Sequence, residues 1–318
     1  MKNNFPLVSI VLPCRNEEKF ISGCLDGFIE QDYPKENMEI LVVDGMSEDK
    51  TRKIVQEYSV KHSFIKLIDN PNKVTPYALN IGIKNSMGEL IFLPGAHAKY
   101  DKQFVSKSVK NLYEQGVDVC GPALKTIPRQ NNLIARAIAL SISSVFGAGN
   151  SAFRVGAEKP VLVDTVFGGC YKKEVFDKVG LFNENLTRSQ DMEFAQRMKK
   201  AGIKILMVPD ITAYYYPKDT LVAFFEHNIK DGVWAVYPLK FVKITFKSRH
   251  YIPLIFVLTL PLSIWPYIPV SLYFSSIIAL KEKDLRLLFV LPVVFFVRHF
   301  AYGFGSILGL IKLVFGKK

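Results

Sequence analysis

Cysteine is scarce in this chain, and a secretory leader is missing from its first residues. The 318 residues include four cysteines, and no two of them are spaced as a CxxC pair: Cys14, Cys24, Cys120 and Cys170. This excludes a dense disulfide framework and is typical of a reducing compartment such as the cytosol. The first apolar stretch, LVSIVLP, is too short for the apolar region of a signal peptide.

Acidic residues are nearly absent from the part of the chain that follows His250, where only two occur. Two long apolar runs take their place, at residues 251–280 and 285–315. Each run is longer than the about 20 apolar residues needed to cross a bilayer. Each is also longer than an ordinary core helix of about 11 residues. The first run contains Trp265 and Pro266 together with further prolines, so a kinked or re-entrant path is an alternative to a straight span.

The net charge of +12 is distributed in a way that favours a membrane surface over a nucleic acid as partner. Residues 240–251, KFVKITFKSRHY, mix basic and aromatic side chains just before the first apolar run, which suits an anionic interface. A second basic cluster ends the chain: Lys312, Lys317 and Lys318. If both clusters are cytoplasmic, the apolar runs form a transmembrane hairpin whose KEKD turn, residues 281–284, lies outside the cell.

Strand-like and helix-like segments alternate through the first 125 or so residues. Continuous apolar stretches predict five strands, at 7–13, 39–45, 64–69, 89–95 and 117–122. Amphipathic spacing predicts four helices between them, at 18–31, 48–62, 75–86 and 101–116, the second with Ser47 as its N-cap. This pattern indicates an α/β fold with a doubly wound, mainly parallel sheet. Ligands of such sheets bind at the carboxyl ends of the strands.

Polar turns follow the predicted strands. The first turn has no glycine before Gly23, so it lacks the GxGxxG pattern of a dinucleotide-binding fold and disfavours a nicotinamide or flavin cofactor. It carries Arg15, Asn16 and Glu17, which suit a nucleotide base and phosphates or, alternatively, a charged helix N-terminus. Asp44 ends the second strand, where its carboxylate suits a base N–H or a ribose hydroxyl, although an Asp-Gly turn is the simpler alternative.

The later turns complete a recognisable order of motifs. Asn72 and Lys73 precede a helix whose N-terminus suits a diphosphate. The fourth strand is followed by PGAHAKY, and further on come FGAGNSAFR, VDTVFGGCYKKEVFDKVGLFNENL and RSQDMEFAQRMKKAG. In this order the stretches resemble family 2 inverting glycosyltransferases with the GT-A fold, and the succinoglycan-biosynthesis type glucosyltransferases in particular. The resemblance covers nearly the whole chain.

The resemblance implies a GT-A domain over residues 1–245 and a membrane-anchoring segment over 246–318 with about two transmembrane helices. Nucleotide-sugar-binding residues are then expected at Pro13, Arg15, Asn16, Glu17, Asp44, Ser47, Asn72, Lys73, Asn80 and Gly95. Acceptor-binding residues are expected at Asp164, Gly168, Gly169, Arg188 and Gln190. Asp191 matches the acidic general base that removes the acceptor's hydroxyl proton; taken without the resemblance, support of a helix N-terminus fits it equally well.

The fourth turn lacks the Asp-x-Asp motif with which GT-A enzymes hold a divalent metal. Gly95 stands at the first position, which leaves His97, with His227 as a further candidate from the far end of the domain. Three alternatives follow. His97 holds Mn²⁺ or Mg²⁺ weakly together with phosphates and water; basic side chains such as Lys73 replace the metal's charge; or the chain binds sugar nucleotide or lipid without turnover. The expected base and nucleotide-side carboxylate are both present, which argues against lost catalysis.

The sequence as a whole predicts an inner-membrane hexosyltransferase with a cytoplasmic catalytic domain. It is expected to move a sugar from a nucleotide donor, with UDP favoured, to a lipid-linked glycan in exopolysaccharide or related glycan synthesis. No nucleic acid polymer is expected as a partner. A polyprenyl-monophosphate sugar transferase is one alternative, since Arg154, Lys172 and Arg188 are candidates to hold a lipid phosphate. A non-catalytic scaffold in a membrane glycan complex is the other.

Overall fold

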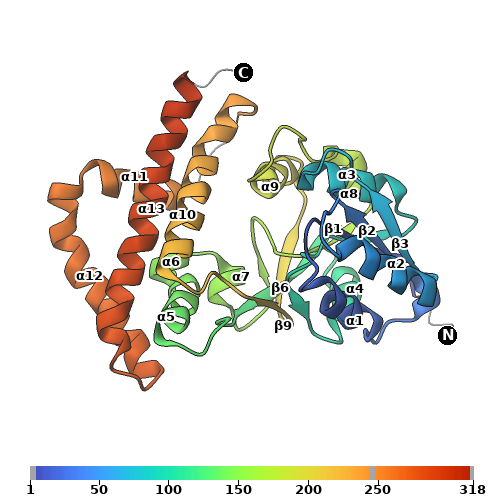
Figure 1. Cartoon of the computed structure of the whole chain (residues 1–318), viewed down its shortest axis with the longest axis horizontal. Helices are drawn as coiled ribbons and strands as arrows, with labels where there is room; N and C mark the ends of the chain where they lie inside the picture. The colour runs from blue at the N-terminus through green and yellow to red at the C-terminus, as the bar shows by residue number, and fades with distance from the viewer. Residues whose placement is uncertain (1–4, 244–247, 316–318) are drawn as a thin grey trace. The chain divides into compact units, whose positions relative to one another are not determined.

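The computed structural model describes residues 5–243 and 248–315, and the chain forms two compact units (Figure 1). The first unit contains residues up to Leu124 together with Gly156–Tyr215. The second contains Lys125–Val155 and the residues from Tyr216 onward. The chain therefore passes between the units three times, and each unit is described by itself.

One mixed sheet runs through the first unit, with the strand order β3-β2-β1-β4-β8-β6-β9-β5 and with β7 paired to β9. The strands are β1 Val8–Cys14, β2 Met38–Asp44, β3 Ile65–Asp69, β4 Leu90–Phe92, β5 Lys99–Tyr100, β6 Val119–Thr126, β7 Val161–Leu162, β8 Cys170–Lys172 and β9 Ile205–Tyr215. β1 to β4 are parallel, and Asp44 lies opposite both Cys14 and Asp69. The carboxyl ends of β1, β2 and β3 are therefore level, which brings the turns after them together.

The helices of the first unit bury their apolar faces on this sheet. Ile21, Leu25 and Phe28 of α1 are fully buried in the same core as Val8, Leu12 and the other inward residues of β1 and β2. Burial of each such side chain stabilises the fold by about 1.5–3 kcal/mol before the entropic cost of ordering the chain. The helices are α1 Ile21–Ile29, η1 Lys35–Asn37, α2 Thr51–Lys61, α3 Thr75–Asn85, α4 Phe104–Glu114, α8 Glu174–Val179 and α9 Gln190–Lys200.

The predicted parallel sheet is confirmed for β1 to β4, but the fifth predicted strand, β6, does not pair with this parallel group. β6 covers the predicted stretch 117–122 from Val119 onward, and it pairs with β8 rather than with β4. β8 lies between them and is antiparallel to both, with Phe92 opposite Cys170. This strand has three residues, too few to show a period in the sequence, so only long-range pairing defines it.

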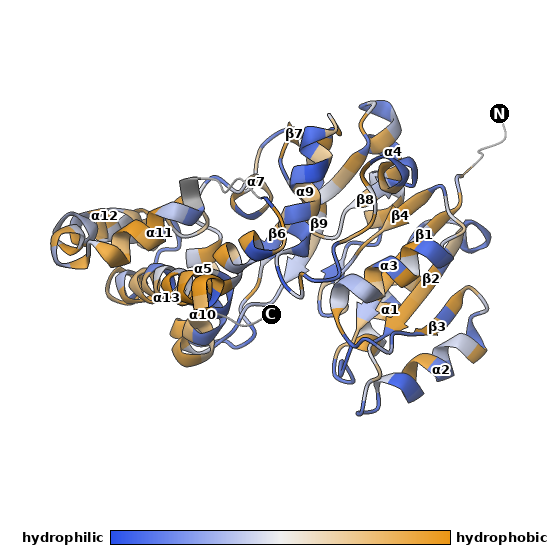
Figure 2. Cartoon of the chain, turned by 90° about the horizontal axis from the view of Figure 1, so that it is seen from above, coloured by the Kyte–Doolittle hydropathy of each residue, from blue (hydrophilic) through white to orange (hydrophobic). Residues whose placement is uncertain are grey.

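Helices make up most of the second unit, and the longest of them, α13, contacts α5, α6, α10, η2, α11 and α12. They are α5 Leu133–Ile142, α6 Val145–Ala148, α7 Ala152–Val155, α10 Leu221–Val236, η2 Tyr237–Lys240, α11 Ser248–Leu258, α12 Leu260–Lys281 and α13 Leu287–Phe315. Figure 2 shows that α12 and α13 consist mainly of hydrophobic residues. By length and composition, both are able to cross a membrane.

Glycines let α10 and α13 come into direct backbone contact. A Cβ added to Gly232 would lie 2.1 Å from the Tyr302 carbonyl oxygen, and one added to Gly305 would lie 2.2 Å from the Ile229 carbonyl oxygen. Neither position has room for a side chain. α10 therefore belongs to the same unit as the apolar helices, as do α5 to α7. The domain boundary expected at residue 245 stays a prediction.

Two glycine-to-alanine changes in helices are expected to have opposite effects. Gly305→Ala forces α10 and α13 apart and should lower the free energy of unfolding by about 1–3 kcal/mol. Gly27→Ala in α1 meets no atom within 4 Å and should raise that free energy by up to about 1 kcal/mol, because alanine favours the helix. Urea unfolding in detergent, followed by circular dichroism, measures both. Equal losses would contradict the direct backbone contact.

Candidate active site

Reciprocal hydrogen bonds join the turns that follow β1 and β2. Asn16 has a left-handed backbone with φ of 55°, and its N–H donates to Ser47 Oγ over 2.8 Å. In return the Glu48 N–H donates to Asn16 Oδ1 over 2.9 Å. The Glu17 N–H donates to Thr51 Oγ1 over 2.8 Å. Asn16, Glu17 and Ser47, all expected to bind the donor, are thus held together in one rigid pair of turns.

Asp44 is fully buried where these turns meet. Its carboxylate accepts hydrogen bonds from Ser47 Oγ at 2.5 Å and from Arg52 Nη1 at 2.7 Å. Arg52 Nη2 also lies 2.8 Å from Asp69 Oδ1, at the end of β3. A buried carboxylate needs such a partner to offset its desolvation. Asp44 therefore braces the turns of three strands, and a direct bond from it to the donor stays a prediction.

Ser47 does not have the predicted N-cap role. α2 begins at Thr51 with Lys50 in the N-cap position. The Thr51 N–H donates to Asp49 Oδ1 over 2.9 Å. The Ser47 hydroxyl is instead taken up by Asp44. The correction has a simple cause, because the turn after β2 continues for several residues before the helix starts.

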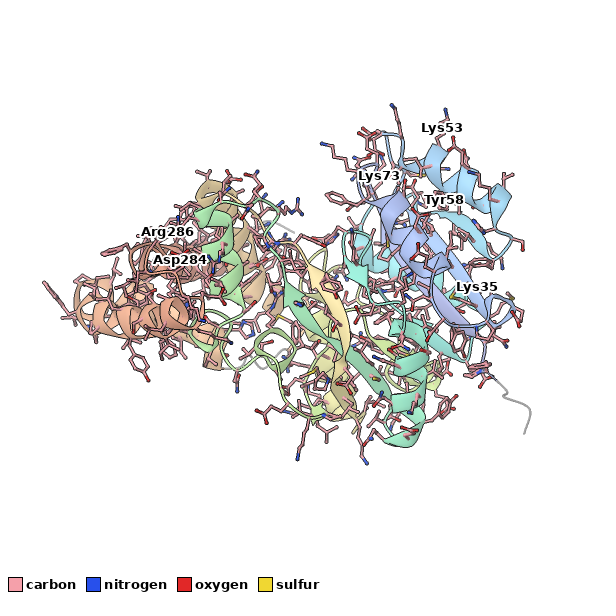
Figure 3. All side chains as sticks on the ribbon, turned by 90° about the horizontal axis from the view of Figure 1, so that it is seen from below. Lys35, Lys53, Tyr58, Lys73, Asp284 and Arg286 are labelled. Carbon is pink, nitrogen blue, oxygen red and sulfur yellow. The ribbon has the colours of Figure 1, made fainter. Side chains whose placement is uncertain are left out.

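Charged side chains line the exposed rim of the same edge. Arg15 Nη2 lies 3.7 Å and Lys73 Nζ lies 4.0 Å from Glu48 Oε1. A Cβ added to Gly45 would lie 3.2 Å from the Arg15 side chain and 3.3 Å from the Lys73 carbonyl oxygen, so three turns converge there. Figure 3 shows Lys73 at this edge. The cations from the first and third turns are therefore brought together, as expected for residues that meet phosphates.

The other expected donor residues have different surroundings. Pro13 lies inside β1 opposite Val43, and the Asn72 N–H donates to Asn70 Oδ1. Asn80 is buried: its Nδ2 donates to the Phe182 carbonyl oxygen over 2.9 Å and its Oδ1 accepts from the Phe182 N–H over 2.9 Å. Its side chain thus fastens α3 to the segment before α9, and a contact of Asn80 with the donor stays a prediction.

The GAHAKY segment is held by a partly buried tyrosine. The Gly95 N–H donates to Tyr100 Oη over 2.9 Å, and the Tyr100 ring stacks on Phe28 with ring centroids 5.4 Å apart. Burial raises the pKa of Tyr100, which therefore stays a neutral hydroxyl. This leaves His97 with 44% of its side chain exposed and its Nδ1 3.8 Å from Glu17 Oε1. The turns after β1 and β4 thus bring an imidazole and a carboxylate together.

Gly95 has room for the Cβ atom of a side chain. Its φ is not in the left-handed region, and an added Cβ would lie 3.6 Å from Phe167 Cζ and 3.8 Å from His97 Cε1, which are ordinary contacts. Within residues 5–243 and 248–315 no three His, Cys, Asp or Glu side chains gather as a metal site. His227 belongs to the second unit and lies 3.3 Å from Asp231 Oδ2.

The FGG turn before β8 packs on the same tyrosine. Gly168 has φ of 59°, and a Cβ on it would lie 3.0 Å from Tyr100 Oη. The Leu93 N–H donates to the Gly169 carbonyl oxygen over 3.0 Å. The two glycines therefore join the GAHAKY segment to β8, and their expected contact with an acceptor stays a prediction.

Asp191 is exposed in the first turn of α9. Ser189, with a left-handed φ of 59°, turns the chain into the helix, whose N-terminus stabilises a carboxylate. Gln190 Oε1 is buried, and no described residue supplies a hydrogen bond to it. Burial raises the pKa of Tyr171, and the charge of Asp191 raises it further. An exposed carboxylate and an unsatisfied acceptor thus occupy adjacent positions.

A buried ion pair fixes α9 in place. Arg197 Nε and Nη2 donate to the two carboxylate oxygens of Glu193 over 2.7 and 2.9 Å. The same guanidinium donates to the carbonyl oxygens of Leu181, over 2.7 Å, and of Val179. Glu193 is therefore a supporting residue, and it holds the helix that carries Asp191.

Basic side chains near α9 have acidic neighbours. Lys199 Nζ lies 3.5 Å from Asp164 Oδ1, and Lys172 Nζ lies 4.0 Å from Asp118 Oδ1. The predicted acceptor residue Asp164 therefore has a lysine of α9 itself as a partner. Arg188 lies partly buried just before α9, and Arg154 belongs to the second unit.

Residues 9–180 match the family described as glycosyl transferase family 2. The chain belongs to this family. The chain is 32% identical to a protein of Methanococcus voltae, and the match covers 96% of this chain and 97% of that protein. The relative is named dolichyl N-acetyl-alpha-D-glucosaminyl phosphate 3-beta-D-2,3-diacetamido-2,3-dideoxy-beta-D-glucuronosyltransferase. It is also 25% identical to the succinoglycan biosynthesis protein ExoA of Rhizobium meliloti, over 74% of this chain and 76% of that one. The family match and these two relatives confirm the resemblance seen in the motifs of this glycosyltransferase.

Solved structures confirm the GT-A fold of this family 2 member. One is a mannosyltransferase from Pyrobaculum calidifontis, solved with GDP-mannose and Mn²⁺, which matches with a TM-score of 0.63 at 18% identity. The match covers 99% of this chain and 89% of the mannosyltransferase chain. Staphylococcus aureus TarS residues 1–349, solved with UDP, has a TM-score of 0.52 at 18% identity and covers 94% and 89%. At such identities the likeness shows the fold alone.

Several residues of the site were not predicted from the glycosyltransferase motifs. Arg52 and Arg197 neutralise buried carboxylates, Tyr100 holds the turn that carries His97, and Tyr171 packs against Phe194 of α9. The only local signal was the spacing of Arg197, four residues after Glu193 on one helix face. Arg52 and Tyr100 lie eight and five positions from their partners Asp44 and Gly95, and these separations are set by turns that show no helical period.

Proposed function

We propose that this glycosyltransferase inverts the anomeric centre of a nucleotide-bound sugar, with UDP as the expected nucleotide, and transfers it to a saccharide carried on a polyprenyl phosphate. The name of the Methanococcus relative, which includes a dolichyl phosphate-linked sugar acceptor, supports the acceptor class. The similarity to a succinoglycan biosynthesis protein supports a role in glycan assembly. The exposed apolar helices of the second unit support reaction at a membrane surface.

The observation that carries the proposal is the exposed carboxylate of Asp191 beside the unsatisfied Gln190 Oε1. An acceptor hydroxyl bound there gives its proton to Asp191 as its oxygen attacks the anomeric carbon. The bond between that carbon and the donor's diphosphate breaks, and the nucleoside diphosphate leaves on the opposite face. Such a base typically contributes a factor of about 10²–10⁴ to the rate.

A divalent metal fits the pair formed by His97 and Glu17. The structure supplies one imidazole nitrogen and one carboxylate 3.8 Å apart, and phosphate and water oxygens would complete the coordination. Mn²⁺ accepts such a mixed set more readily than Mg²⁺, which depends on hard oxygen ligands. When bound, the metal would neutralise charge on the leaving diphosphate. Arg15 and Lys73 at the same sheet edge would share that task.

Removing either member of the pair should weaken Mn²⁺ binding at least about tenfold, a loss of about 1.4 kcal/mol. His97→Ala and Glu17→Gln test this, with free Mn²⁺ measured by electron paramagnetic resonance in the presence of UDP. Gly95→Asp should strengthen binding, since a Cβ meets only ordinary contacts there and the carboxylate restores a hard anionic ligand. Glu57→Gln, an exposed carboxylate on α2, is the matched control. Unchanged binding in His97→Ala and Glu17→Gln would leave the segment a structural turn.

The function itself is tested with membranes that contain the full chain, a radiolabelled UDP-sugar and a polyprenyl-phosphate-linked saccharide, followed by lipid extraction. Label on the lipid-linked saccharide supports the proposal. Label on polyprenyl phosphate added without a saccharide would indicate a polyprenyl-monophosphate sugar transferase instead. Absence of transfer with a panel of UDP- and GDP-sugars would favour the scaffold alternative.

A further inference from the structure

Several large hydrophobic side chains of α12 and α13 are exposed. In the most apolar windows of α12 and α13, 17% and 33% of the residues are buried. Leu262, Trp265 and Phe289 leave 78%, 74% and 77% of their surfaces uncovered. A continuous apolar surface of this extent needs an apolar partner, and flanking basic residues such as Lys240 and Lys312 suit the headgroups of a bilayer.

The turn between α12 and α13 is fastened to α5 by an ion-pair cluster. Arg136 of α5 places Nη2 2.8 Å from Glu282 Oε2 and Nη1 2.9 Å from Asp284 Oδ2. Arg286 also binds Asp284 with two bonds of 2.9 Å, and Figure 3 shows these two side chains together. The hydrogen bond from Arg286 lowers the pKa of Asp284 to about 2, so the cluster stays ionised. The turn is therefore anchored to α5.

α5 has to lie on the same side of a membrane as the catalytic unit. It belongs to residues 125–155, which leave the first unit after Leu124 and return to it at Gly156. Crossing a bilayer takes about 20 apolar residues in each direction. α5 has 10 residues, and α6 and α7 have four each. This excursion is too short to cross and return, so the turn bound to Arg136 stays on the catalytic side.

The far half of α13 is also tied to the catalytic side. Its Gly305 meets Ile229 of α10, and its Gly309 would place a Cβ 2.7 Å from the Val233 carbonyl oxygen of the same helix. α10 follows the sheet directly and carries Glu226, His227, Lys230 and Asp231, so it is unsuited to a bilayer interior. The start of α11 joins the same half through His250 Nδ1 and Tyr302 Oη, 2.6 Å apart. Both ends of the apolar segment formed by α11, α12 and the first half of α13 are thus fixed to the catalytic side of the membrane.

We propose that α11, α12 and the first half of α13 enter one leaflet of the bilayer and return, so that no helix of the second unit spans the membrane. The partner of their exposed apolar surface is the acyl region of that leaflet, with the basic flanks at its headgroups. The proposal rests on the membrane association in the proposed function. It takes the place of the expected transmembrane hairpin, whose KEKD turn would lie outside the cell.

Impermeant maleimide labelling of single-cysteine variants of the full chain in cell membranes tests this topology. Lys281→Cys reports the turn, and Lys53→Cys on α2, exposed in Figure 3, reports the catalytic unit. Both should be labelled in inverted vesicles and at least about tenfold less in intact spheroplasts. Leu262→Cys should resist labelling from either side until detergent is added. The four native cysteines are buried, and burial raises the pKa of Cys24 and Cys120 to about 12, so the parent chain is the unlabelled control.

Labelling of Lys281→Cys in spheroplasts, with Lys53→Cys protected, would establish a spanning hairpin and overturn the proposal. Recovery of the parent chain in the soluble fraction, or labelling of Leu262→Cys without detergent, would overturn it as well. None of these readouts uses sugar transfer. A spanning anchor would therefore leave the proposed reaction intact, and an inactive chain could still show the one-leaflet topology.

Discussion

Asp191→Asn is expected to lower turnover at least about 100-fold while the affinity for UDP changes less than about threefold. The amide keeps the size of the carboxylate and loses its ability to accept the acceptor's proton. Asp191 is exposed at the start of α9, so the change leaves no buried charge without a partner and should not alter folding. Initial rates at saturating donor and acceptor, with UDP binding measured by calorimetry, give the two quantities separately.

The matched control is Glu57→Gln, which makes the same chemical change at an exposed position of α2. It should leave both turnover and UDP affinity within about twofold of the parent. Turnover by Asp191→Asn near that of the control would remove Asp191 from the mechanism. A loss of UDP affinity as large as the loss of turnover would instead show that Asp191 binds the donor.

Arg197→Ala is expected to lower the free energy of unfolding by about 3 kcal/mol or more. The change leaves the buried Glu193 carboxylate without its bidentate partner and the Leu181 carbonyl oxygen without its donor. For a chain of this size that loss corresponds to a fall in melting temperature of roughly 4–5 °C. The same variant should also lose activity, since the helix that carries Asp191 is no longer fastened to α8. Differential scanning calorimetry in detergent measures the stability.

A double variant separates the buried charge from the packing. Glu193→Leu with Arg197→Met replaces the ion pair by apolar groups of similar volume, and it should recover at least half of the stability lost in Arg197→Ala. Equal instability of the single and double variants would show that the hydrogen bonds of Arg197 to Val179 and Leu181, rather than the charge of Glu193, account for the loss.

Strands and helices that are defined by local sequence patterns were predicted well. β1, β2, β3 and α3 agree with their predicted ranges to within one or two residues, because continuous apolar strands and helical periods are local signals. Asn80 illustrates the opposite case. Its type and its place on α3 suited a ligand contact, but its hydrogen-bond partner Phe182 lies 102 positions away, so its structural role had no local signal.

The sequence by itself determined the family, the strand and helix pattern of the first unit, the candidate base at Asp191 and the missing carboxylate at Gly95. Motif order and apolar period carry that information residue by residue. Only the tertiary structure decided that Glu17 stands beside His97, that Asp44 is held by Arg52, and that Arg136 binds the turn of the apolar helices. Each of these depends on which turns and helix ends meet in space, and that is set by the packing of the whole unit.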